Sequence, residues 1–236
     1  MIRFFAPLVA AVLVSCGGGG AAPTAASAEG LWTGTSTSGY GVNALVLENG
    51  EIWGLYGAGT SIYGALFGNL TVNGTSLSGS GSDFNILART VTAGTFTGSA
   101  STKNTISVAT SSGGSFSGTY NSFYDQAPTA LASLAGTFSG TGVTGRAPVQ
   151  AQTVTVSATG ALTSSVTGCL ASGQATLRAS GKNVYNITVT FTGASCALGS
   201  GTVVNGVAIY SPTTRQLTSM GLTGSKSDGF IFVGTK

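Results

Sequence analysis

Side chains that could carry out acid–base chemistry are scarce in this sequence. The chain of 236 residues has no histidine and six acidic residues. A Ser-His-Asp triad is therefore excluded, and we expect no metal and no cofactor. A pair of carboxylates remains, since a glycosidase needs two of them about 5–9.5 Å apart. Glu48 and Glu51 flank a turn and can come that close, so a glycan hydrolase is one alternative; a solvated hairpin tip is the simpler interpretation.

The first of the three cysteines stands where an export signal would end. Residues 1–15 begin with a basic residue and contain an apolar run, Phe4 to Val14, too short to span a bilayer. Leu13-Val14-Ser15-Cys16 resembles the lipobox of bacterial lipoproteins. The resemblance implies a signal peptide at 1–15, cleavage before Cys16 and acylation of its thiol, with palmitate as an expected label. Gly17 implies sorting to the outer membrane; a plain secretory signal is the alternative.

The other two cysteines, Cys169 and Cys196, would face an oxidising compartment if the chain is exported. We expect them to form a disulfide, which closes a loop worth about 3.5 kcal/mol in the chain-entropy model. Two free buried thiols are the alternative. A zinc site is not expected, because two cysteines without histidine cannot supply four ligands.

The composition favours an exported β protein. Charged residues make up 6% of the chain, against about a quarter in typical domains, and 38 residues are glycine. The formal net charge is +3, with no basic run, so nucleic acid is not an expected partner. No apolar stretch after the signal is long enough for a transmembrane helix.

Short apolar runs bounded by glycine indicate strands after a Gly/Ala-rich tether at 16–28. Asn49-Gly50 and Asn73-Gly74 each join two such runs and predict type I′ hairpins. The first strand begins at Trp32. The following strands of the first half are expected at 42–48, 51–56, 62–72, 75–80, 84–88, 91–98, 105–109 and 115–120.

The strand pattern breaks at residues 125–135, where Leu131 and Leu134 predict a short helical turn. A second series begins at Phe138. It continues with strands expected at 149–157, 162–166, 175–179, 184–192, 203–210, 216–222 and 230–233. In 184–192 the alternation places Tyr185, Ile187, Val189 and Phe191 on one face. We therefore expect two β modules, at 29–124 and 136–236, with 125–135 as the linker.

A short motif, Gly-x-(Phe or Trp)-(Ser or Thr)-Gly, recurs along the chain and opens both modules. Its aromatic residues are expected to point inward, and its glycines to let the strands bend. The four aromatic residues are Trp32, Phe96, Phe116 and Phe138. Open sheet edges need charges for protection, which this chain lacks. The sequence therefore predicts an all-β fold of two tandem antiparallel barrels of about eight strands each, with a two-sheet sandwich as the alternative.

The opening Gly30-Leu31-Trp32-Thr33-Gly34, the lipobox and the glycine run after Cys16 together resemble surface lipoproteins of Gram-negative bacteria. The transferrin-binding and factor-H-binding types are the nearest of these. The resemblance implies eight-stranded barrel modules, lipid-anchored at the outer membrane and facing the periplasm or the outside. Uncharacterised lipoproteins that open with the same motif and close like residues 228–236 are also similar. None of the families' binding residues is carried over.

Aromatic side chains are the candidate binding residues. Tyr40, Trp53, Tyr56 and Tyr63 cluster in the first module and could stack on a sugar or anchor a protein partner; filling the barrel is the alternative interpretation. Asp125 and Asp228 fall in turns, where they are expected to cap backbone groups. The sequence thus predicts a non-catalytic, membrane-anchored lipoprotein that binds a protein or glycan, with a structural or adhesive envelope protein as the alternative.

Overall fold

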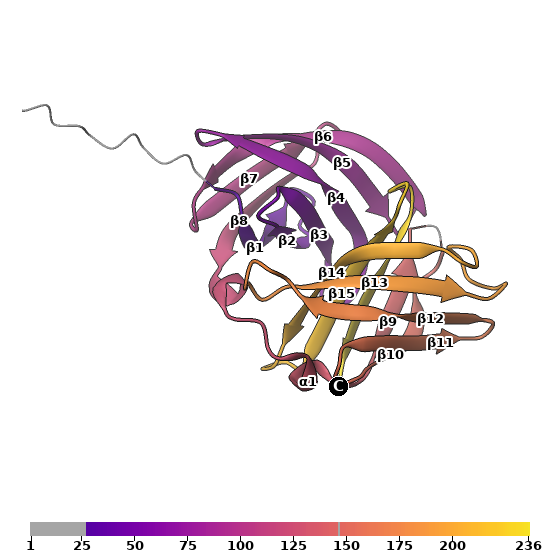
Figure 1. The fold of residues 1–236 in the computed structure, drawn as a ribbon. Helices are drawn as coiled ribbons and strands as arrows, with labels where there is room; N and C mark the ends of the chain where they lie inside the picture. The colour runs from indigo at the N-terminus through magenta and orange to yellow at the C-terminus, as the bar shows by residue number, and fades with distance from the viewer. Residues whose placement is uncertain (1–26, 146) are drawn as a thin grey trace, which may run out of the picture.

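A computed structural model describes residues 27–145 and 147–236. Its ribbon consists almost entirely of strands, arranged as two barrels (Figure 1). The predicted signal peptide, Cys16 and the tether as far as residue 26 lie outside the described residues.

The first barrel contains eight antiparallel strands in sequence order and closes where its last strand pairs with its first. Neighbouring strands are joined by short turns, so all the pairings but the closing one are hairpins. The strands are β1 (Gly30–Ser36), β2 (Gly41–Val46), β3 (Glu51–Ala58), β4 (Ser61–Asn73), β5 (Ser76–Asn85), β6 (Thr90–Ser101), β7 (Thr105–Thr110) and β8 (Ser115–Asn121).

The second barrel repeats this plan after a short connection that holds the 3-10 turn η1 (Ser122–Asp125) and the helix α1 (Leu131–Leu134). Its strands are β9 (Gly136–Thr144), β10 (Gln150–Val156), β11 (Ala161–Val166), β12 (Cys169–Leu177), β13 (Tyr185–Thr192), β14 (Val203–Ser211), β15 (Gln216–Thr223) and β16 (Gly229–Thr235). Strand β16 pairs with β9 and closes the barrel. The predicted fold of two tandem eight-stranded antiparallel barrels is confirmed.

Alternation along each strand fills the barrels. In β13 Tyr185, Ile187, Val189 and Phe191 are buried in the core of the second barrel, as predicted, while the residues between them face outward. All four motif aromatics are also inside. Trp32, Phe96 and Phe116 belong to the core of the first barrel, and Phe138 to that of the second.

The same arrangement closes both barrels. Gly34 of β1 lies opposite Gly118 of β8, and Gly140 of β9 lies opposite Gly234 of β16. In each last strand, the phenylalanine two residues before the glycine folds its ring over the place a Cβ would occupy. A side chain at Gly118 or Gly234 would displace that ring. Three copies of the motif therefore lie at the seams, those at 30–34 and 114–118 in the first barrel and that at 136–140 in the second, whereas the copy at 94–98 lies in β6.

The two predicted Asn-Gly hairpins form, but neither is a type I′ turn, which needs positive φ at both central residues. Among described residues other than glycine, φ is positive at Arg89, Lys103, Arg215 and Lys226, so neither asparagine qualifies. Gly50 has φ +82° and is the last residue of a three-residue hairpin loop. Its N–H donates a hydrogen bond to the carbonyl oxygen of Leu47 at 2.9 Å. At Gly74, φ is +63° at the first of two loop positions, the pattern of a type II′ turn.

Some predicted boundaries were wrong. The strands expected at 75–80 and 84–88 are one strand, β5, which runs through Gly79 and Gly81 to Asn85. Strand β12 begins at Cys169 and not at 175. The predicted tether extended to residue 28, but Ala28 is buried and its carbonyl oxygen accepts a hydrogen bond from Trp32 Nε1 at 2.8 Å. Small residues also occur inside strands, at positions where another part of the backbone comes close. The small residues in β5, in β12 and at Ala28 were therefore wrongly assigned to turns or to the tether.

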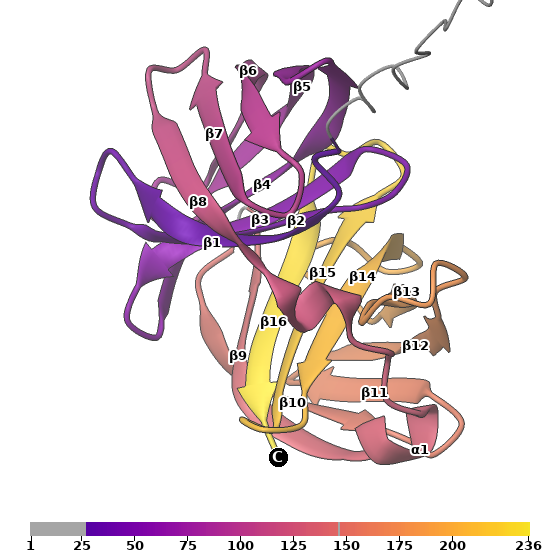
Figure 2. The ribbon, with the colours of Figure 1, turned by 90° about the vertical axis from the view of Figure 1, so that its left-hand side faces the viewer.

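A third hydrophobic core lies between the barrels. Outward-facing side chains of the first barrel, such as Leu45, Trp53 and Phe67, form one cluster with Met220 and Ile231 of the second. Figure 2 shows β14, β15 and β16 running up against the first barrel. The two barrels therefore share a buried apolar interface.

Ion pairs border this interface. Asp125 of η1 receives hydrogen bonds from Lys103 and Lys182, both at 2.7 Å, and from the Tyr120 hydroxyl at 2.9 Å. These contacts hold the pKa of Asp125 well below its ordinary value. The expectation that Asp125 caps backbone groups was therefore wrong, because it joins Lys103 of one barrel to Lys182 of the other. Asp228 does cap, accepting from the N–H groups of Gly145 and Gly229.

Candidate functional site

The two ends of the first barrel differ. One end holds the first described residues, Ser27 and Ala28. The Ser27 N–H donates to Thr102 Oγ1 at 2.9 Å, and Ala28 packs into the core. Since the strands alternate in direction, the turns at 37–40, 59–60, 86–89 and 111–114 all lie at the opposite end. That end opens into a cavity of about 320 Å³. We call it the first mouth.

Three of the four predicted binding aromatics meet at the first mouth. The rings of Tyr40 and Tyr56 stack with centroids 6.1 Å apart and 19° between their planes. Tyr63 meets Tyr40 edge-on, with centroids 5.2 Å apart. Tyr40 and Tyr56 line the cavity, and all three rings are partly exposed. The three rings therefore remain partly accessible to a ligand, although Tyr56 also packs against the core of the first barrel.

A carboxylate stands beside these rings. Asp83 belongs to the inward face of β5, and its Oδ1 accepts a hydrogen bond from the Tyr56 hydroxyl at 2.8 Å. Within the described residues it pairs with no lysine or arginine. Burial raises the pKa of Asp83, an effect that the Tyr56 hydrogen bond partly offsets. Burial, followed by the Asp83 hydrogen bond, also raises the pKa of Tyr56.

A glycine on the neighbouring strand makes room for the ring of Tyr56. Gly64 of β4 is directly opposite Tyr56 of β3, and a Cβ at Gly64 would collide with the phenol ring. The absence of a side chain at Gly64 thus lets the ring lie flat across β4, with its hydroxyl reaching Asp83.

The rest of the wall combines the apolar side chains of Val42, Leu66, Phe96 and Phe116 with hydroxyl and amide groups that can donate and accept hydrogen bonds. It contains Ser36, Thr37, Ser38, Ser82, Asn85, Thr92, Thr110, Ser111, Ser112 and Ser115. Stacked rings, one carboxylate and many neutral polar groups make a surface suited to a polyhydroxylated ligand.

Trp53, the fourth predicted binding residue, lies elsewhere. It faces outward from β3 into the core between the barrels, where it is 7% exposed and meets Phe67 edge-on at 5.2 Å. Its Nε1 is buried without a hydrogen-bond partner. Alternation explains the separation, because Trp53 and Tyr56 are three residues apart and must face opposite sides of one strand.

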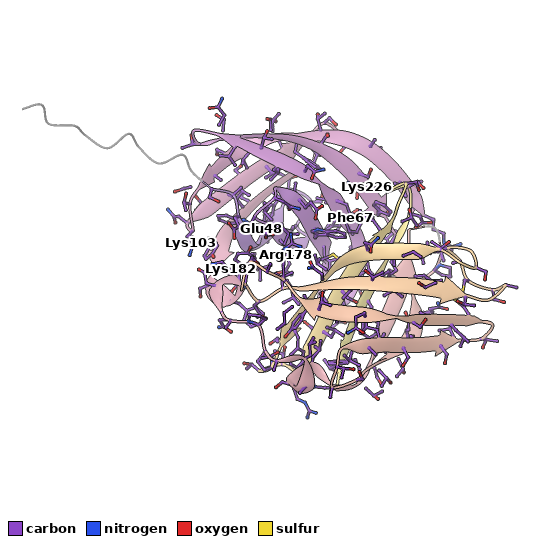
Figure 3. The ribbon with its side chains drawn as sticks, viewed as in Figure 1. Glu48, Phe67, Lys103, Arg178, Lys182 and Lys226 are labelled. Carbon is purple, nitrogen blue, oxygen red and sulfur yellow. A yellow bond between two sulfur atoms is a disulfide. The ribbon has the colours of Figure 1, made fainter. Side chains whose placement is uncertain are left out.

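Glu48 and Glu51, the carboxylates of the alternative hydrolase interpretation, have different environments. Glu51 lines a groove of about 540 Å³ between the barrels, whereas Glu48 pairs with Arg178, which lines that groove. Arg178 holds Glu48 with Nη2–Oε1 at 2.7 Å and Nε–Oε1 at 2.9 Å, and this pairing lowers the pKa of Glu48. Glu51 lines the groove together with Trp53 and Lys226. Figure 3 shows Glu48 beside Arg178, with Phe67 and Lys226 farther along. A lowered pKa is the reverse of what a general acid requires.

The predicted disulfide is confirmed. Cys169 begins β12 and Cys196 lies in the loop after β13, with their Cα atoms 4.8 Å apart. The bond pins that loop at the open end of the second barrel. A hollow of about 860 Å³ lies there, lined in part by Cys169, Phe191 and Leu198.

Asp83 was missed as a site residue by sequence reasoning. The expected strands at 75–80 and 84–88 left it in a turn between them. The sequence did contain a sign of its position. Leu77, Gly79, Gly81 and Asp83 are every second residue of one strand and so share a face, and the carboxylate of Asp83 must point into the barrel as Leu77 does.

Within residues 27–145 and 147–236, no three potential metal-binding side chains come together. No helix in this part of the chain is long and apolar enough to cross a membrane. The first mouth, with its tyrosines and Asp83, is the candidate site that the geometry supports best. No protein-family model matches the chain, and neither a curated protein nor a solved structure shows significant similarity to it.

Proposed function

We propose that this protein is a lipid-anchored, non-catalytic binding protein of the bacterial outer membrane, and that its first mouth binds a glycan. The observation that carries the proposal is the inward carboxylate of Asp83, held by Tyr56 beside the stacked ring of Tyr40. A ring face can stack on a sugar, and a carboxylate can accept hydrogen bonds from two sugar hydroxyls.

The direction of the first mouth supports the proposal. Ser27 and Ala28 lie at the opposite end of the barrel, so a tether leading back to a lipidated Cys16 leaves from that end. The first mouth therefore lies at the end of the barrel opposite Ser27, so the segment that precedes Ser27 joins the barrel away from the proposed glycan site.

The surroundings of the acidic residues support binding without turnover. A glycosidase needs a second carboxylate near the first. Four other acids are engaged elsewhere: Glu29 accepts from Tyr124, Glu48 pairs with Arg178, and Asp125 and Asp228 are bonded as described above. Glu51 lines the groove between the barrels, whereas Asp83 lines the first mouth.

The experiment is a calorimetric titration of residues 27–236 with a panel of neutral and acidic oligosaccharides. We expect at least one to bind, with affinity reduced tenfold or more by Tyr40→Ala and by Asp83→Asn. Glu51→Gln makes the same chemical change outside the first mouth and is the matched control, with unchanged affinity expected. Chromatography of the sugar after incubation should find it intact.

Two results would contradict the proposal. One is the absence of binding by any member of a broad panel. The other is Asp83-dependent binding of tetramethylammonium with no sugar bound, which would make the first mouth a cation site formed by tyrosine rings and a carboxylate.

A further inference from the structure

The first mouth carries a negative charge. Among the described residues that line its cavity, Asp83 is the one charged side chain. The four turns at this end of the barrel contain one further charged residue, Arg89, which is exposed and does not line the cavity. A ligand that enters the cavity therefore meets a carboxylate that no lining cation of the described chain neutralises.

The protein uses only part of the hydrogen-bonding capacity of this carboxylate. The Tyr56 hydroxyl donates to Oδ1 of Asp83 at 2.8 Å, and no other described residue makes a hydrogen bond or ion pair with the carboxylate. The residues directly opposite Asp83 on the neighbouring strands are Leu66 of β4 and Thr92 of β6, and neither carries a charge. Oδ2 of Asp83 is therefore available to a donor that a ligand brings.

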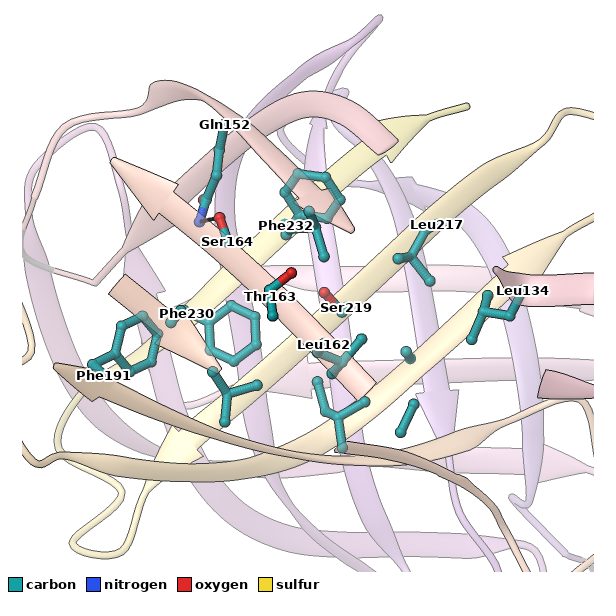
Figure 4. Close-up of a pocket in the computed structure, with 16 residues that line it drawn as sticks. Leu134, Gln152, Leu162, Thr163, Ser164, Phe191, Leu217, Ser219, Phe230 and Phe232 are labelled. Carbon is teal, nitrogen blue, oxygen red and sulfur yellow. Dashed lines mark hydrogen bonds between the residues drawn. The ribbon is translucent and has the colours of Figure 1, made fainter. Parts of the chain in front are cut away.

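An inward carboxylate is not needed to fill an eight-stranded barrel. The second barrel closes in the same way, and its interior contains a cavity of only about 40 Å³, too small for more than about one or two water molecules. Figure 4 shows Phe191, Phe230 and Phe232 among the side chains around this cavity. The described residues that line it include no charged side chain. Packing therefore does not explain Asp83 in the first barrel.

The tyrosine rings beside Asp83 also favour a positive charge. Tyr56 bonds Asp83 directly, and Tyr40 stacks on Tyr56 with ring centroids 6.1 Å apart. An ammonium group forms charge-assisted hydrogen bonds with a carboxylate, and within about 6 Å of a tyrosine ring it is also attracted to the ring face. The cavity of about 320 Å³ lies within the range of small-molecule pockets, about 300–1,000 Å³, and can hold a sugar residue.

We infer that the first mouth prefers an amino sugar, a glycan with a free and positively charged amino group that donates to Asp83 beside the ring of Tyr56. This inference rests on the proposed glycan binding and names the class of glycan. Neutral glycans use the same rings and hydroxyl groups but bind more weakly, because they leave the carboxylate without a cation. Acetylation of the amino group removes its charge and therefore the preference.

The test is a calorimetric titration of residues 27–236 with three disaccharides that share one linkage and differ only in the group on carbon 2 of each sugar. Chitobiose carries a free amine there, cellobiose a hydroxyl group and diacetylchitobiose an acetamide. At about pH 6, where an amine is charged and an ordinary aspartate is ionised, we expect chitobiose to bind at least tenfold more tightly than either of the others. Cellobiose controls for size, since a hydroxyl group and an amine occupy similar volumes.

A variant and a change of salt locate the charge that is recognised. Asp83→Asn keeps the size of the side chain and should reduce the preference for chitobiose over cellobiose to about twofold or less. Glu51→Gln, the same change in the groove between the barrels, is the matched control and should leave the preference intact. High salt should weaken the binding of chitobiose more than that of cellobiose, because salt screens the charge pair. The comparison of sugars and the salt series use the wild-type protein, so they decide the question even if Asp83→Asn does not fold.

The outcomes separate this inference from the proposed function. If cellobiose or diacetylchitobiose binds as tightly as chitobiose, or if another sugar binds and chitobiose does not, the inference is overturned and glycan binding stands. A preference for chitobiose that persists in folded Asp83→Asn would also overturn the inference, because another group would then recognise the cation. If no sugar binds, charged or neutral, the proposed function fails together with the inference.

Discussion

At the residue scale, Asp83 is the least ordinary side chain in the protein. A carboxylate that faces a barrel interior without a cationic partner in the described residues loses hydration, and only the Tyr56 hydroxyl compensates it. A buried carboxylate of this kind lowers the free energy of unfolding. Such carboxylates are nevertheless common in binding sites, because they can accept hydrogen bonds from a ligand.

The raised pKa of Asp83 predicts how stability depends on pH. The folded state holds this proton at higher pH than the unfolded state, so ionisation of Asp83 lowers the free energy of unfolding as pH rises above about 4. Asp83→Asn should therefore melt at a higher temperature than wild type at pH 7, and the difference should disappear below pH 4. Parallel thermal melts across this range check it, and a variant less stable at pH 7 would contradict it.

Cys16 carries the prediction about anchoring. If it is acylated, radiolabelled palmitate should enter the wild-type protein in a Gram-negative host and be absent from Cys16→Ser. Equal labelling of the two proteins would contradict the prediction, and Cys169→Ser serves as the control for loss of an unrelated cysteine.

At the element scale, the hairpin is the repeating unit, and most hairpins were predictable from the sequence. Alternating side chains and Asn-Gly turns revealed β2 with β3 and β4 with β5, because a barrel strand has one apolar face and one polar face. The prediction failed where glycines replace the apolar residues, as in β5. There the inward positions are small because a neighbouring strand or ring lies against them, which no short-range pattern reveals.

The disulfide is the element-scale feature most open to measurement. Reduction, or Cys169→Ala with Cys196→Ala, should lower the stability of the second barrel by about 3.5 kcal/mol, because the bond closes a long loop in the unfolded chain. Denaturant unfolding with and without reductant checks this. Trp32 lies in the core of the first barrel and Trp53 in the core between the barrels, so tryptophan fluorescence follows those two cores during the unfolding.

At the scale of the whole molecule, two barrels form three cores. The core between the barrels could not be predicted from the alternation of apolar and polar residues. Its apolar side chains lie on the outward faces of the strands, where alternation predicts polar residues. In β15, Leu217 is buried inside the barrel, and Met220 and Leu222 are buried outside it. A strand buried on both faces no longer alternates. Trp53 belongs to this core, which is why an aromatic residue expected in a binding site serves packing.

The ion pairs at the edge of this core should couple the barrels. Arg178 is 13% exposed and bonds both Glu48 and Asn186, so Arg178→Met should lower the overall stability by about 1–2 kcal/mol. Lys226→Met, which removes an exposed cation at a nearby turn, is the control, and its effect should be within about 0.5 kcal/mol. Denaturant unfolding measures both variants. Equal losses in the two would show that Arg178 does not couple the barrels.

The Asp125 contacts bear on proteolysis. Residues 125–135 connect the barrels, and Asp125 binds lysines from both of them. Because these contacts stabilise the carboxylate, they persist at neutral pH and weaken as Asp125 is protonated in acid. We expect Asp125→Asn to speed limited proteolysis of this connection at pH 7 about fivefold or more. An unchanged cleavage rate would contradict a role for these ion pairs in holding it.

The most direct test of glycan binding at the first mouth is an NMR titration of the protein carrying labelled tyrosine rings. The ring signals of Tyr40, Tyr56 and Tyr63 should shift on addition of the oligosaccharide selected by calorimetry, since these rings line or border the first mouth. Those of Tyr185 and Tyr210, buried in the second barrel, should stay unchanged. Shifts confined to Tyr185 and Tyr210, or no shift at saturating sugar, would contradict the account.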